Sequence, residues 1–171
     1  AASDVYKRQV LADAQWSICK GASGGGMAAK GGNNGEPHNH NDVGSFFYLV
    51  GDEMLLTDLG AGEYTKEYFH EGRYRILCNN SFGHSVPVID GEGQKEGVEY
   101  SASRFEADGR GKTEISFAGA YGNDKVEELT RVIHYDCAAE TLCVEDCLTA
   151  AKLTETTDAS EPVPMSENLV T

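Results

Sequence analysis

The sequence predicts a mainly β protein, an antiparallel β-sandwich assembled from short strands. Two observations carry this prediction. Apolar, aromatic and β-branched runs of four to eight residues recur along the chain, and turn-forming Gly, Asp and Asn residues separate them. Short strands at such regular spacing are typical of antiparallel sandwiches and barrels rather than of helical folds. Residues 64–69 are the one short segment expected to begin a helix.

The first expected hairpin pairs Ser45–Val50 with Met54–Thr57 around the turn signal Gly51–Asp52. A further strand is expected at His84–Asp90, where the glycines at 91 and 93 end it. The Gly-rich stretch 21–35 fits neither phosphate-loop pattern. It is interpreted as flexible backbone that lets the chain approach a site closely.

Two more hairpins are expected in the second half of the chain. Ser101–Ala107 and Thr113–Ala118 flank the turn residues 108–111. Leu129–Tyr135 and Thr141–Leu148 flank residues 136–140. These pairs complete the sandwich prediction.

Charge and composition exclude several classes of function. The 171 residues include 28 acidic and 14 basic side chains, which gives a net charge of -14. Clustered Lys and Arg are needed to grip nucleic acid, so we expect no nucleic-acid partner. No apolar run approaches the roughly 18 residues of a membrane span, so none is expected.

The five cysteines are odd in number and form no CxxC pair, which indicates neither a disulfide framework nor a zinc knuckle. Cys143 and Cys147 would share one face of a strand, where buried free thiols are expected.

The two ends of the chain are interpreted with caution. Residues 1–9 resemble a translated sequencing adapter, which predicts a scar without fold information. Residues 10–171 are then expected to be a partial β-sandwich domain that is cut at both ends.

Histidines and one aspartate suggest a metal site. Asp58 ends the second strand of the first expected hairpin and can fold back beside the segment of His40, and His84 begins the next expected strand, so the three residues offer ligands from three segments. Imidazole nitrogen and carboxylate oxygen are ligands that zinc accepts. The alternative is that they are hydrogen-bonding loop residues.

His38 stands two residues before His40, so on an extended chain both side chains would point to one face. Proton transfer or charge neutralisation is its functional interpretation, and a second metal ligand or a solvated loop residue is the alternative. Arg73, Tyr74 and Arg75 form a basic and aromatic cluster that could hold a carboxylate or stack on a sugar. A surface ion pair is the common alternative.

A family resemblance rests on these residues. The segment 28–46, which includes the run His38-Asn39-His40-Asn41-Asp42-Val43-Gly44-Ser45-Phe46, resembles the signature of the heparinase II/III-like polysaccharide lyases. Asp58-Leu59-Gly60, Tyr64-Thr65, Arg73-Tyr74 and residues 83–89 continue that pattern in the family's order. The resemblance covers about Trp16 to Phe105.

The resemblance implies a supersandwich-like β domain that follows an α/α toroid, which this chain lacks. It also implies cleavage of uronic-acid polysaccharides by β-elimination. By position it implies that His38 assists at the uronate and that His40, Asp58 and His84 hold a mainly structural zinc ion. Arg73 and Tyr74, from the basic and aromatic cluster, are the expected substrate-binding residues. The family's catalytic Tyr lies in the toroid, so this chain alone is expected to be inactive.

Two alternatives remain. One is a non-catalytic, zinc-stapled module that binds carbohydrate. The other is a cupin-type metal enzyme, which would need a carboxylate three or four residues after His40, where Val43 and Gly44 stand instead. The resemblance places the protein in the cell envelope, in the periplasm or outside the cell, with the cytoplasm as the alternative.

Overall fold

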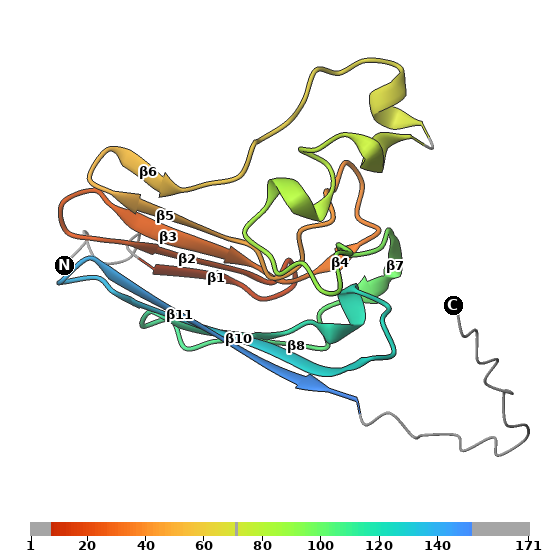
Figure 1. The fold of residues 1–171 in the computed structure, drawn as a ribbon. Helices are drawn as coiled ribbons and strands as arrows, with labels where there is room; N and C mark the ends of the chain where they lie inside the picture. Colours follow the sequence, from red (N-terminus) through yellow and green to blue (C-terminus); the bar gives the residue numbers. More distant parts are fainter. Residues whose placement is uncertain (1–7, 71, 152–171) are drawn as a thin grey trace, which may run out of the picture.

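The computed structural model describes residues 8–70 and 72–151, and these residues form two facing antiparallel sheets with a small third sheet at one end (Figure 1). The five-stranded sheet has the order β1-β2-β3-β5-β6 and comprises β1 (Arg8–Leu11), β2 (Trp16–Lys20), β3 (Gly26–Lys30), β5 (Phe46–Val50) and β6 (Glu53–Leu56). The four-stranded sheet has the order β11-β10-β9-β8 and comprises β8 (Arg104–Ala107), β9 (Lys112–Ser116), β10 (Val126–Asp136) and β11 (Thr141–Ala150). β4 (Asn33–Asn34) and β7 (Gly97–Ser101) form the third sheet.

The core lies between the two larger sheets, because alternate side chains of each strand face inward. In β10 the inward Leu129, Ile133 and Tyr135 are buried, whereas the outward Val132 is half-buried and His134 is exposed. The buried core residues are Cys19, Met27, Ala29, Val43, Phe46, Ile115, Phe117, Ala120, Tyr121, Leu129, Ile133 and Tyr135. This two-layer packing confirms the predicted mainly β, antiparallel sandwich.

All three predicted hairpins are present. β5 and β6 pair with Leu49 opposite Met54, β8 and β9 pair with Phe105 opposite Ile115, and β10 and β11 pair along their lengths. The edges of both larger sheets are open in the described residues, so these strands do not form the closed barrel that a cupin requires.

The predicted strand at Ser101–Ala107 is two strands. β7 ends at Ser101 and β8 begins at Arg104, and the two belong to different sheets. The backbone N–H of Ala102 donates to the carbonyl of Gly32, whereas that of Ser103 donates to the carbonyl of Ser116. The chain therefore passes from one sheet to another between Ser101 and Arg104. The polar and apolar residues of 101–107 follow one another without a break, so the sequence does not reveal this crossing.

The prediction of a strand at His84–Asp90 is wrong. The segment consists of turns and irregular backbone, with one isolated bridge between Ile89 and Glu92. Pro87 has no N–H to donate to a ladder, and Asp90 has a φ of 54°, which is incompatible with a strand. His84 therefore lies in a loop rather than at a sheet edge.

The four strands before β5, namely β1 to β4, were not predicted. β3 lies inside the Gly-rich stretch that was interpreted as flexible backbone, because its small residues give no strand signal. Gly26 is required there, since a Cβ would lie 2.5 Å from the Cys19 carbonyl oxygen of the paired strand. Of the predicted scar, residues 1–7 lie outside the described residues, and Arg8 and Gln9 belong to β1.

In its described residues, 57–70 and 72–96, the segment between β6 and β7 contains no strand of its own, and it extends beyond the five-stranded sheet (Figure 1). It holds three short 3-10 helices, η1 (Glu67–Phe69), η2 (Arg73–Arg75) and η3 (Ser81–Gly83), and a fourth, η4 (Ala118–Ala120), precedes β10. The helix expected over 64–69 is thus limited to η1. None of the helices in the described residues is long and apolar enough to cross a membrane.

The cysteines of β11 differ from expectation. Cys143 and Cys147 do share the outward face of the strand, but both are exposed rather than buried. β11 is an edge strand whose outward face no other described element covers, so the thiols remain at the surface.

Candidate functional site

The three predicted metal ligands lie together although they come from separate loops. His40 precedes β5, Asp58 follows β6, and His84 follows η3. The His40 and His84 rings lie 5.2 Å apart between centroids, and His84 Nδ1 lies 3.2 Å from Asp58 Oδ2. The structure therefore brings the three predicted residues into one cluster at the base of the segment that joins β6 to β7.

His84 is the centre of this cluster. Its side chain is fully buried, and its Nε2 lies 3.1 Å from the carbonyl oxygen of Cys78. A carbonyl only accepts, so Nε2 donates its hydrogen to Cys78. A neutral His84 then presents the lone pair of Nδ1 to the Asp58 carboxylate, which is also an acceptor.

The Asp58 carboxylate only accepts, so a hydrogen bond at 3.2 Å needs a hydrogen on His84 Nδ1, whereas an Nδ1 without hydrogen offers a lone pair that a metal ion could share with Asp58. Asp58 is held for such a role, because its other oxygen, Oδ1, accepts the backbone N–H of Gly60 at 2.7 Å. The donor set of one carboxylate and two imidazoles fits zinc in kind.

His40 completes the set with a neutral imidazole. Its burial, together with the neighbouring His84, lowers its pKa, which favours the uncharged ring that can donate a lone pair. Its Nε2 lies 3.1 Å from the Tyr68 hydroxyl, so Tyr68 orients the ring. Sequence reasoning missed Tyr68, which lies in η1 and carries no spacing signal.

The side chains as they stand are hydrogen-bonded to partners rather than arranged around a common point. Within residues 8–70 and 72–151 no group of three or more His, Cys, Asp or Glu side chains has the geometry to hold a metal ion. Zinc binding by His40, Asp58 and His84 would thus replace the hydrogen bond of His40 to Tyr68 or the contact of His84 with Asp58.

His38 lies apart from this cluster. Its backbone is not extended but has a φ of 60°, so the alternation that would place it on the face of His40 does not apply. The exposed ring packs edge-to-face on Phe69, with 5.6 Å between centroids. A non-glycine residue in the left-handed region costs about 1 kcal/mol or more, and such strain is concentrated at functional positions.

Arg73 and Tyr74 hold the turn that carries both histidines. The Arg73 guanidinium donates to the carbonyl of Asn39, and the Tyr74 hydroxyl donates to the Asn39 side-chain oxygen at 3.1 Å. Arg73 also stacks over the Tyr74 ring at 5.0 Å. Both predicted substrate-binding residues therefore position Asn39, whereas Arg75 is exposed.

A buried polar network that the sequence did not indicate supports this turn. The Gln94 side chain accepts from the Val43 N–H at 2.9 Å and donates to the Val43 carbonyl at 2.6 Å. The Ser81 hydroxyl donates to the Asn41 carbonyl and accepts the Gln94 N–H, both at 2.8 Å. No motif marks Gln94, because its role depends on packing between distant loops.

Arg131 joins this network to the four-stranded sheet. The side chain is buried in β10 and forms a bidentate pair with Asp146 of β11, with both N–O distances 2.6 Å. Its remaining terminal nitrogen donates to the carbonyls of Gly44 and Ser85. The Arg131 guanidinium thus fixes two loops to the sandwich, the one that leads from His40 to β5 and the one that carries His84.

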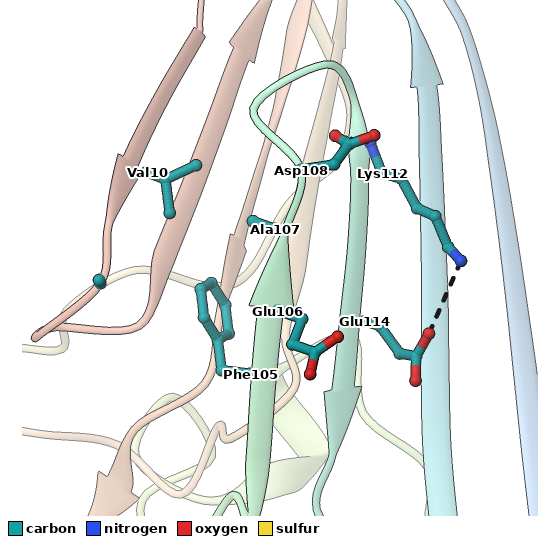
Figure 2. Close-up of a pocket in the computed structure, with 8 residues that line it drawn as sticks. Val10, Phe105, Glu106, Ala107, Asp108, Lys112 and Glu114 are labelled. Carbon is teal, nitrogen blue, oxygen red and sulfur yellow. Dashed lines mark hydrogen bonds and ion pairs between the residues drawn. The ribbon is translucent and has the colours of Figure 1, made fainter.

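A groove of about 520 Å³ lies elsewhere, between the edge strands β1 and β8 (Figure 2). Val10 and Phe105 face each other across it, while Glu106, Lys112 and Glu114 lie on its polar side. It includes none of the predicted site residues. The histidine cluster is therefore carried by surface loops and not by this groove.

Comparison with known proteins assigns no family. No protein-family model matches the chain, and no curated protein sequence matches it.

Proposed function

We propose that this chain is the β-sandwich domain of a heparinase II/III-like polysaccharide lyase that cleaves uronic-acid glycans by β-elimination. The observation that carries the proposal is the meeting of His40, Asp58 and His84 beside the turn that presents His38. The sequence signature relates these same four positions to that family. The buried hydrogen bonds of Gln94 and Ser81 hold this turn in one conformation, which explains how loops could present such a site.

His40, Asp58 and His84 would hold the zinc ion that the family resemblance implies. When bound, zinc would link the three loops and add positive charge near an anionic substrate. Arg73 and Tyr74 would keep the His38–His40 turn in place through Asn39. Their role in this proposal is therefore positioning rather than direct contact with substrate.

His38 is the residue of this chain that we assign to the uronate. β-Elimination removes the proton at C5, breaks the bond between C4 and the glycosidic oxygen, and leaves a double bond in the sugar. Negative charge develops on the uronate carboxylate as the C5 proton leaves. The exposed His38 imidazole would donate a hydrogen bond to that carboxylate, while the base that accepts the C5 proton would come from the toroid domain of the longer protein.

The test is elimination by the longer protein that carries the toroid. Product from heparan, alginate or hyaluronan is followed by the ultraviolet absorbance of the unsaturated uronate. We expect His38→Ala to lower kcat by about 100-fold or more. His134→Ala is the matched control, because His134 is exposed on the outward face of β10 and should leave kcat unchanged. Absence of unsaturated product from every uronate polymer would contradict the proposal.

One observation favours a second candidate, a carbohydrate-binding module without catalysis. Tyr64 and Phe69 are exposed aromatic side chains that contact each other edge-to-face at 5.1 Å. Exposed aromatic rings are suited to stack on sugar faces. Retention on uronate polymers by the 171-residue chain, together with no elimination by the longer protein, would favour this alternative.

A further inference from the structure

Two cysteines, one in the five-stranded sheet and one that follows β10 of the four-stranded sheet, pack in the same core. Cys19 lies on the inward face of β2 and is only 3% exposed. Cys137 is the first residue after β10, in the turn that leads to β11, and packs half-buried against the core that contains Cys19. The strand pairing that surrounds them is regular on both sides.

Arg8 lies beside both cysteines. Arg8 is the β1 residue paired with Cys19, and its Nε donates to Cys137 Sγ at 3.4 Å. Burial raises the pKa of Cys19 to about 11, and the proximity of the Cys137 thiol adds to that rise. Arg8 and the shared core therefore place Cys19 and Cys137 in the same neighbourhood, and neither belongs to the histidine site.

The turn that carries Cys137 is fastened to the opposite sheet. The Tyr48 hydroxyl of β5 donates to the carbonyl of Glu140 at 2.7 Å. The Ser23 hydroxyl and N–H, in the turn between β2 and β3, both donate to the Glu140 carboxylate. Cys137 is thus held near Cys19 by contacts that do not involve either sulfur.

The other three cysteines are unsuited to pairing. Cys143 and Cys147 lie four residues apart on one strand, so about 13 Å separates their Cα atoms. A disulfide requires Cα atoms within about 7 Å. Cys78 is buried in the loop beside η3, where its Sγ contacts the Asn79 side chain.

We propose that Cys19 and Cys137 are a built-in dithiol that oxidises to a disulfide joining the two sheets. The oxidant is a low-molecular-weight disulfide such as oxidised glutathione. Formation of this bond would close a long segment of chain, from β2 to the β10–β11 turn, and restrict the unfolded state.

The chemistry balances in two exchange steps. The more accessible Cys137, as thiolate, attacks one sulfur of oxidised glutathione, which forms a mixed disulfide and releases one glutathione thiolate. Cys19 then loses its proton and attacks the Cys137 sulfur of that mixed disulfide. The second glutathione leaves, so two protein thiols are oxidised and one glutathione disulfide is reduced to two glutathiones.

The test uses the full 171-residue chain with Cys143→Ser and Cys147→Ser, which removes the exposed thiols that would couple separate molecules. Treatment with oxidised glutathione should reduce the free thiols from three to one, and peptide mapping should identify a Cys19–Cys137 link. The melting temperature should rise by roughly 5 °C or more and return to its original value on reduction.

Two variants keep the result decisive. Cys137→Ser leaves the core residue Cys19 unchanged and should abolish both the thiol loss and the temperature rise. Arg8→Gln should retain the link, because the turn is fastened through Glu140 and not through Arg8 alone. A mixed glutathione adduct at Cys137 without a Cys19 link, or no loss of thiols in the folded protein, would overturn the proposal.

Discussion

The sandwich and the site-bearing loops are held together in different ways. Between the sheets, apolar side chains such as Met27 of β3, Ile115 of β9 and Ile133 of β10 are buried in one core cluster to which both sheets contribute. The loops 31–45 and 57–96 instead depend on side chains such as Gln94, Ser81 and Asn79 that bond to backbone groups. Apolar packing stabilises without direction, whereas each of these hydrogen bonds fixes one atom in one place.

This difference teaches where sensitivity to mutation should lie. Damage to the sandwich core should lower the stability of the whole fold. Damage to the polar network should displace the histidines and lower global stability less than damage to the core. The reason is that a buried group that loses its hydrogen-bond partner disturbs mainly the structure around it. Substitutions that separate stability from site geometry therefore test the comparison.

The largest effect is expected at the residue that belongs to both regions. Arg131→Ala would leave Asp146 without its bidentate partner and release the carbonyls of Gly44 and Ser85. We expect a loss of about 4 kcal/mol in the free energy of unfolding, because two carbonyls lose their donor and the buried Arg131 side chain leaves a cavity, whereas the Asp146 side chain is 34% exposed and can be hydrated. Urea unfolding measures it, and a loss near zero would show that Arg131 does not join the two regions.

A core substitution should follow. Ile133→Ala removes a side chain that is 0% exposed and should cost about 3 kcal/mol in the free energy of unfolding. The matched control is Val132→Ala on the outward side of the same strand, where the loss should be under about 1 kcal/mol. Equal losses for the two variants would contradict the assigned faces of β10.

The polar network should respond differently. Gln94→Ala removes both hydrogen bonds to Val43 and one from Asn34, and should cost about 2 kcal/mol of stability. Unlike Ile133→Ala, it should shift the NMR signals of His40 and His84 even under strongly native conditions. Unchanged histidine signals in the folded variant would show that Gln94 does not position the site.

The hairpins and the sandwich could be predicted because turn residues and apolar runs are local signals. The approach of Asp58 to His40 was also predictable, since a hairpin between β5 and β6 brings their segments together, whereas His84 joins them from a loop and not from the strand that the sequence predicts. Tyr68, Gln94 and Arg131 were not predictable, because their roles depend on contacts between residues far apart in the chain. The strand β3 was not predicted, because its small residues have low β propensity. They fit this position because the neighbouring strand lies close to them.

The smallest stability effect is expected at His38. Its φ of 60° is unfavourable for a side chain with a Cβ, so His38→Gly should stabilise the fold by about 0.5 kcal/mol. His70→Gly, at an exposed position that is not among the left-handed residues, should give no such gain. A destabilised His38→Gly variant would show that the ring's contact with Phe69 outweighs the backbone strain.

The central claim is that three loops meet to form a zinc site, and zinc content measures it most directly. The purified 171-residue chain, loaded with zinc and dialysed, should retain about one zinc ion per molecule. His40→Ala and His84→Ala should each lose that ion and lower the melting temperature, whereas His134→Ala, on the far face of the other sheet, should retain it. A wild-type chain that retains no zinc, or His84→Ala that retains as much as the wild type, would contradict the account.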